Sequence, residues 1–111
     1  MELDIQTERR AGQCEITLRG EVDVYTAPKL KEGLVSLIGE GCTNLVIDLE
    51  GVSFIDSSGL GVLVSALRRA RERDGAVRIV CTRENILKIF RITGLDKVFP
   101  VFTDIAEARE F

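Results

Sequence analysis

Two adjacent serines, Ser57 and Ser58, supply the hydroxyl groups of the segment FIDSSGLG at residues 54–61. A serine hydroxyl can act as a nucleophile or can accept a phosphate group. A nucleophilic serine needs a general base, and the chain contains no histidine to supply one. Neither serine has the glycine two positions earlier that a nucleophile elbow requires. The segment therefore predicts phosphorylation rather than catalysis, and we expect that the chain is not an enzyme.

Phosphorylation is structurally tolerable here, because the serine pair stands where an apolar segment ends and a helical pattern begins. The N-terminus of a helix offers unpaired backbone N–H groups and the positive end of its dipole. A phosphate adds roughly −1.5 to −2 charges at pH 7, next to Asp56 and near Asp23. We therefore expect a charge switch that alters partner binding on a preserved fold. In the alternative interpretation, Ser57 or Ser58 is only a helix N-cap worth about 1 kcal/mol.

Two glycines, Gly59 and Gly61, follow the serines in the first turns of this predicted helix. Each costs a helix up to about 1 kcal/mol relative to alanine, which indicates that another group closely approaches the backbone. The sequence SGLG lacks the spacing and lysine of a P-loop and the third glycine of a dinucleotide loop. Nucleotide binding, or a small phosphate-ester or nucleotide-processing activity at these serines, is the alternative that we rank last.

The bulk composition predicts one ordinary globular domain spanning residues 1–111. The chain is 45% hydrophobic and 30% charged, with a net charge of −3. This charge argues against nucleic acid and against an anionic membrane as partners. No apolar stretch approaches the roughly 20 residues of a membrane span, and the first residues lack a signal-peptide pattern. We expect a cytoplasmic protein.

The three cysteines, Cys14, Cys42 and Cys81, are odd in number and widely spaced. Disulfide frameworks and zinc sites usually show paired or clustered cysteines. We therefore interpret the cysteines mainly as small core residues. Cys14 and Cys81 lie in register with apolar neighbours in strand-like segments. Cys42 fits this interpretation least well, because it follows Gly41 in a predicted loop.

The remaining pattern predicts an α/β fold. Alternating or continuous apolar runs indicate strands, and apolar spacing of three and four residues indicates helices. Expected strands cover residues 2–7, 14–18, 45–49, 76–81 and 98–102. Expected helices begin at Thr26 with Pro28 in the first turn, at the serine pair, at Thr82, and at Thr103 or Asp104. Pro100 favours an edge position for the last strand.

This order of elements is an N-terminal hairpin followed by alternating helices and strands. It predicts a mixed central sheet with parallel crossovers and about four helices. Loops at the carboxyl ends of parallel strands gather along one edge of the sheet, where partners usually dock. The loops at residues 21–26 and 54–61 should therefore lie side by side.

The chain resembles the STAS-domain family, specifically the bacterial anti-sigma factor antagonists that regulate sporulation and stress sigma factors. The resemblance covers nearly the whole length, and VSFIDSSGLGVL at residues 52–63 is its most specific part. Further support comes from LRGEVD at 18–23, LVIDL at 45–49, ITGL at 92–95 and KVF at 97–99.

The resemblance implies a STAS-like fold and a partner-switching cycle. The unphosphorylated protein would bind an anti-sigma factor that is also a serine kinase, which frees the sigma factor. The kinase would then phosphorylate Ser57, the serine directly after the aspartate, and a metal-dependent serine phosphatase would reset the cycle. ATP and magnesium would belong to the kinase, so no cofactor is expected in this chain. The expected partner-binding residues are Glu21, Asp23, Asp56, Ser57, Ser58, Gly59, Leu60 and Gly61.

Three alternatives remain open at this level. Ser58 competes with Ser57 as the phosphorylated residue. Asp23, which matches an acidic family position linked to kinase contact, could equally be a solvated loop carboxylate. The whole chain could be a non-switching interaction module, since STAS-like domains also occur in transporter accessory proteins and in stress-sensing complexes.

Overall fold

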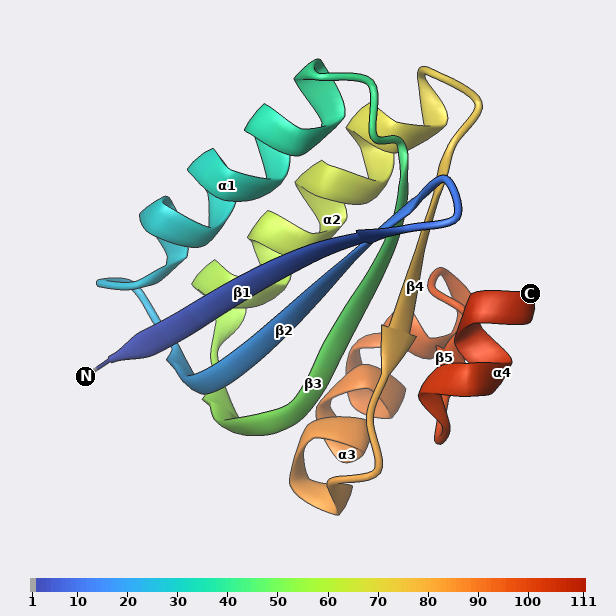
Figure 1. Ribbon diagram of the computed structural model, residues 1–111. Coiled ribbons are helices and arrows are strands. Elements are labelled where there is room, and N and C mark those ends of the chain that lie inside the picture. Colours follow the sequence, from blue (N-terminus) through green and yellow to red (C-terminus); the bar gives the residue numbers. More distant parts are fainter. Residues whose placement is uncertain (1) are drawn as a thin grey trace.

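The computed structural model describes residues 2–111 as one five-stranded sheet with helices packed on it (Figure 1). The strands lie in the order β1-β2-β3-β4-β5. The β1–β2 pair is antiparallel, and the other three neighbouring pairs are parallel. This confirms the predicted hairpin, mixed sheet and parallel crossovers. The elements are β1 (Leu3–Arg10), β2 (Gln13–Val22), α1 (Ala27–Gly39), β3 (Asn44–Ile55), α2 (Ser57–Arg71), β4 (Ala76–Val80), α3 (Glu84–Thr93), the 3-10 helix η1 (Leu95–Lys97), β5 (Val101–Phe102) and α4 (Ile105–Glu110).

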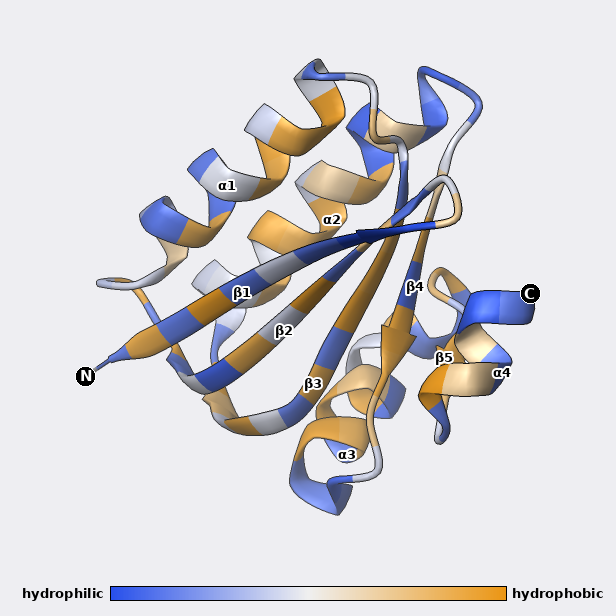
Figure 2. Cartoon of the chain, viewed as in Figure 1, coloured by the Kyte–Doolittle hydropathy of each residue, from blue (hydrophilic) through white to orange (hydrophobic). Residues whose placement is uncertain are grey.

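The main core lies on one face of the sheet. Helices α1, α2 and α3 bury their apolar side chains there, including Leu34, Leu63 and Phe90. Figure 2 shows apolar residues on the sides of α1 and α2 that face the sheet and polar residues on their outer sides. A smaller cluster joins Val46 and Val80 to Ala108 of α4. Because successive side chains of a strand point to opposite faces, α4 covers the other face of the sheet.

The central strand is longer than its sequence pattern predicts. Residues 45–49 are in a strand as expected, but β3 continues to Ile55. Its second half pairs with β2, up to the register partners Val22 and Ile55. The prediction that Phe54 and Ile55 lie in a loop was therefore wrong. The continuous apolar pattern ends at Leu49, but backbone pairing with β2 extends the strand beyond it.

Two of the expected helix starts differ in detail. Thr26 occupies the N-cap position of α1, yet its hydroxyl caps no helical N–H. It donates instead to the Glu21 carbonyl at 2.8 Å. The N-cap of α3 is Arg83 rather than Thr82, whose backbone N–H and hydroxyl both donate to the Glu50 carboxylate. The hydroxyl groups of both threonines thus bind other residues instead of capping a helix.

The interpretation of the cysteines was correct for Cys81 and incomplete for the other two. Cys81 is a free, buried residue of the main core. Cys14 and Cys42 are also buried, but they form a disulfide between β2 and the loop after α1. Their spacing of 28 residues gave no sign of this pairing, because the crossover through α1 brings them together.

The C-terminal elements agree with their sequence signals in order, but the strand predicted at residues 98–102 is shorter, since β5 covers only Val101–Phe102 and Val98 ends the 3-10 helix η1 as its C-cap. Asp104 caps α4 by accepting a hydrogen bond from the Ala106 N–H at 3.0 Å. Pro100 directly precedes the edge strand β5, and Gly94 ends α3 with a left-handed φ of 75°. Within residues 2–111, none of the helices has both the length and the apolar character needed to cross a bilayer.

Candidate functional site

The two loops that the sequence singled out meet at the carboxyl ends of β2 and β3. Val22 and Ile55 are register partners at these strand ends. The Asp56 N–H donates to the Val22 carbonyl at 3.1 Å, which ties the start of the serine segment to the β2–α1 loop. The expectation that residues 21–26 and 54–61 lie side by side is confirmed.

Asp56 is the N-cap of α2. Its backbone is extended, and its Oδ1 accepts hydrogen bonds from the N–H groups of Ser58 at 2.9 Å and Gly59 at 3.2 Å. The interpretation of a serine as the helix cap was therefore wrong. Ser57 and Ser58 are the first two helical residues, with Ser57 exposed and Ser58 half-buried. The Ser57 hydroxyl thus lies at the molecular surface beside a carboxylate that already uses the nearest N–H groups.

The two glycines of α2 have different surroundings. A Cβ atom on Gly59 would lie 2.6 Å from Cγ1 of Val22 and 2.8 Å from Cγ1 of Ile55. Gly59 therefore lets α2 pack directly onto the ends of β2 and β3. A Cβ on Gly61 would meet nothing within 4 Å, and this residue is exposed. The expected close approach to the helix backbone is found at Gly59, where the side chains of Val22 and Ile55 approach it. Leu60 between them is buried.

Asp23 is a buried residue that organises the β2–α1 loop. Only 4% of its surface is exposed, so its interpretation as a solvated carboxylate was wrong. Its Oδ1 accepts hydrogen bonds from the N–H groups of Tyr25 at 2.9 Å and Thr26 at 3.0 Å, and from the Thr26 hydroxyl at 3.3 Å. Burial opposes ionisation, but these hydrogen bonds outweigh it and hold the pKa of Asp23 below its ordinary value.

The loop held by Asp23 presents apolar side chains to solvent. Val24 is 60% exposed and Tyr25 is 82% exposed. At the adjacent end of β3, Phe54 is 42% exposed. We call these three residues, with Ser57 and Gly61, the docking edge. Large apolar side chains concentrated at one edge are typical of a protein-interaction site.

The sequence interpretation did not single out Val24, Tyr25 or Phe54 as surface residues. A usable signal was present for the first two, which are adjacent large side chains between a strand and a helix and belong to neither pattern.

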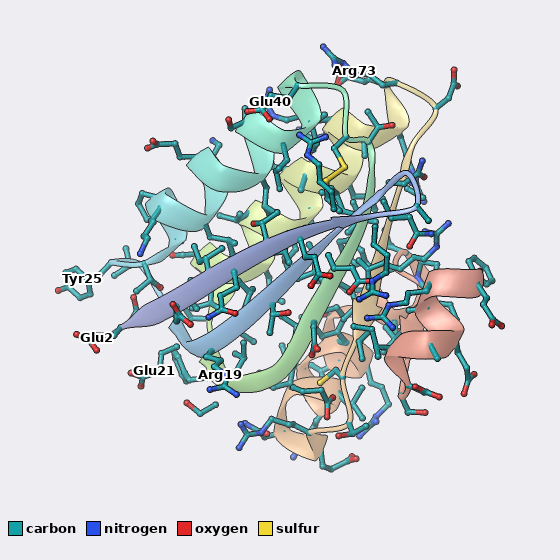
Figure 3. All side chains as sticks on the ribbon, in the orientation of Figure 1. Glu2, Arg19, Glu21, Tyr25, Glu40 and Arg73 are labelled. Atoms are coloured by element: carbon teal, nitrogen blue, oxygen red, sulfur yellow. A yellow bond between two sulfur atoms is a disulfide. The ribbon has the colours of Figure 1, made fainter. Side chains whose placement is uncertain are left out.

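Charged side chains surround the same end of the sheet. Figure 3 shows Glu2, Arg19, Glu21 and Tyr25 projecting outward there. Glu21 is half-buried, and its backbone N–H donates to the Glu2 carbonyl at 3.0 Å. In the part of the chain that the structure describes, no three histidine, cysteine, aspartate or glutamate side chains are grouped to hold a metal ion.

Comparison with known proteins agrees with this class of fold. The STAS domain family model matches residues 4–108. The chain therefore belongs to the STAS-domain family.

Two curated relatives and one solved structure with high similarity to this chain are named as anti-sigma factor antagonists. The anti-sigma-B factor antagonist of Bacillus subtilis (strain 168) is 33% identical over 101 residues, which cover 91% of this chain and 92% of the relative. That of Staphylococcus aureus (strain NCTC 8325 / PS 47) is 36% identical and covers 91% of this chain and 94% of the relative. A solved anti-sigma factor antagonist from Mycobacterium paratuberculosis superposes with a TM-score of 0.91 at 28% identity, covering 98% and 92% of the two chains.

Proposed function

We propose that this chain is an anti-sigma factor antagonist whose partner binding is switched off by phosphorylation of Ser57. The observation that carries the proposal is the exposed Ser57 hydroxyl in the first turn of α2, directly after the capping Asp56. The names of the two curated relatives support the antagonist role, since both match over 91% of this chain.

The surroundings of Ser57 suit a phosphate that would change partner binding without changing the fold. The N–H groups of Ser58 and Gly59 already bind Asp56, so a phosphate on Ser57 would extend from the surface. The helix dipole favours a negative charge at this end. The phosphate would add roughly two negative charges beside the Asp56 carboxylate. A partner seated on the docking edge would meet this charge, while the packing of α2 would stay unchanged.

The proposed partner is an anti-sigma factor with serine kinase activity, and a serine phosphatase would restore the unphosphorylated form. ATP and magnesium would be bound by the kinase. The chain would act as one domain spanning residues 1–111, as a substrate and binding protein in the cytoplasm. Asp23 and Gly59 would contribute through the shape of the docking edge, because both are buried.

Tyr25 is the side chain best placed to anchor the partner. It is the most exposed large hydrophobic residue among residues 2–111, and hydrogen bonds to Asp23 order its loop. Tyrosine is enriched among residues that dominate binding energy. We expect Tyr25→Ala to weaken kinase binding by at least about 2 kcal/mol, or roughly 30-fold. The control is Ile92→Ala, which removes another exposed apolar side chain, 73% exposed, from α3. Equal effects of the two variants in a titration would contradict the docking edge.

The switch itself is tested by incubating the purified chain with its kinase and ATP and locating phosphate by mass spectrometry. We expect phosphate on Ser57, and none on the Ser57→Ala variant, which should still bind the kinase. Ser57→Asp should bind more weakly while keeping the circular dichroism spectrum of the wild type.

Three outcomes would count against the proposal. Phosphate on Ser58 alone would move the switch to that residue. A Ser57→Asp variant that binds as tightly as wild type would refute the charge mechanism. Stable binding of the kinase without any phosphorylation would favour the non-switching interaction module.

A further inference from the structure

The Cys14–Cys42 disulfide lies at the end of β2 opposite the docking edge. Cys14 is near the start of β2, and Cys42 is in the loop between α1 and β3. The strand from Cys14 to Val22 spans roughly 26 Å at about 3.3 Å per residue. Figure 1 shows the β1–β2 turn and the start of α2 at opposite ends of the sheet. The disulfide is therefore separate from the proposed switch.

The two cysteines are both buried but differ in their position relative to the surface, since Cys42 is 6% exposed. Cys14 is completely buried, at 0% exposure. Cys42 borders a surface hollow of about 330 Å³, which the β1–β2 turn and Gly41 also line. A molecule entering this hollow reaches Cys42 first. Gly41 is exposed and adopts a left-handed φ of 100°, so the loop beside Cys42 is not covered by packed side chains.

We propose that the Cys14–Cys42 disulfide is a thiol–disulfide exchange site, opened by a low-molecular-weight thiol that enters this hollow and attacks the Cys42 sulfur. The incoming thiolate forms a mixed disulfide with Cys42 and releases Cys14 as a thiolate, which takes up a proton. A second thiol molecule attacks the mixed disulfide and leaves Cys42 as a thiol. The two small thiols are oxidised to their disulfide as the protein disulfide gains two electrons. Closure is the reverse reaction, with the small disulfide as oxidant.

The charges at the hollow favour the attacking thiolate. Arg9 and Arg10 at the end of β1 both line it. Arg9 is ion-paired with Glu40 at 3.0 Å, and Arg10 with Glu8 at 3.1 Å and Glu15 at 3.5 Å. Arg9 and Arg10 are the charged residues among those that line the hollow, and nearby cations stabilise a thiolate.

The exchange is confined to this pair. Cys81 is buried, and burial raises the pKa of its thiol, so it stays protonated and inaccessible. Reduction of the disulfide also leaves the local backbone hydrogen bonds in place. The Gly41 N–H donates to the Ile38 carbonyl and the Cys42 N–H to the Leu37 carbonyl, both at 3.0 Å. The reduced protein therefore keeps its fold and loses only the covalent constraint.

The consequence of opening is a change in stability. A bridge between cysteines 28 residues apart restricts the unfolded chain. For a domain of this size its loss lowers the melting temperature by roughly 10–15 °C. The docking edge lies at the other end of the sheet and stays intact. Exchange at Cys42 thus adjusts the lifetime of the protein rather than its affinity for a partner.

The test equilibrates the full chain, without denaturant, in glutathione buffers of increasing ratio of reduced to oxidised form, followed by alkylation and mass mapping. We expect Cys14 and Cys42 to become alkylated together, Cys81 to react only after unfolding, and the melting temperature to fall by roughly 10–15 °C. The Cys42→Ser variant should melt at the temperature of the reduced wild type. In the Cys14→Ser variant, oxidised glutathione should form a mixed disulfide on Cys42.

Three results would overturn the inference. The pair could stay oxidised in reduced glutathione until the protein unfolds, which would make it a purely structural disulfide. Glutathione could be found on Cys14 of the wild type rather than on Cys42. Cys14 and Cys42 could also remain thiols in oxidised glutathione. Kinase binding and Ser57 phosphorylation are measured separately, so the proposed function can fail without affecting this result.

Discussion

Gly59 and Gly61 form a matched pair for alanine substitution, because they lie two residues apart in α2 with opposite surroundings. In Gly59→Ala the added methyl group lies 2.6 Å from Val22 Cγ1 and 2.8 Å from Ile55 Cγ1. Both neighbours are buried at paired strand ends and cannot move independently. In Gly61→Ala the methyl group enters open space. The same mutation should therefore have opposite effects on stability at the two sites.

The magnitudes follow from two competing effects. Overpacking in a core costs about 1–3 kcal/mol, while replacing glycine by alanine in a helix gains up to about 1 kcal/mol. With the full helix gain, Gly59→Ala should therefore destabilise the fold by up to about 2 kcal/mol, and Gly61→Ala should stabilise it by up to about 1 kcal/mol. For 111 residues, each kcal/mol corresponds to about 4 °C in the melting temperature.

Thermal and urea denaturation of both variants would measure these changes. A Gly59→Ala protein as stable as Gly61→Ala would refute the packing argument. Kinase titration adds an independent readout, since Gly61 belongs to the docking edge. We expect Gly61→Ala to bind the kinase more weakly than wild type despite its higher stability. Unchanged binding would remove Gly61 from the docking edge.

Two further predictions concern carboxylates. Asp56→Ala should cost about 1 kcal/mol of unfolding free energy through the loss of the α2 cap, and a urea midpoint equal to that of wild type would contradict the capping role. Stability in acid should depend on Asp23 and Glu15, because both have a lowered pKa in the folded protein. For Asp23 the cause is the set of hydrogen bonds described above. For Glu15 the hydrogen bond from Arg109 lowers the pKa, burial opposes this effect, and the charges of Arg109 and Arg10 lower it further. Both folded-state pKa values are lowered, so this stabilisation is complete above the unfolded-state values of about 4 and is lost as pH falls through the folded-state values. Urea unfolding between pH 2 and 7 should show the loss, with a smaller pH dependence for Asp23→Asn and Glu15→Gln, and equal wild-type stability at pH 3 and pH 7 would contradict it.

Local patterns were sufficient to predict most elements and the adjacency of the two segments in which we propose the site. Alternation in residues 14–18 and the apolar run at 45–49 indicated β2 and the first half of β3. The aspartate and serines at residues 56–58 marked a helix start, and the order of elements predicted that this start would lie beside residues 21–26. These features depend on neighbouring residues or on chain order, which a sequence displays directly.

The tertiary structure decided which side chains of that site are buried and which are exposed. Asp23 and Tyr25 are two residues apart in one loop. Asp23 is buried and accepts hydrogen bonds from the backbone of this loop, whereas the Tyr25 side chain projects into solvent. The need for glycine at position 59 depends on Val22, and the disulfide joins residues separated by 28 positions. Such contacts arise from the register of β2 on β3 and from the crossover through α1. Spacing along the chain does not encode these contacts. The sequence therefore predicted which two segments lie together, and only the fold determined which of their side chains are exposed.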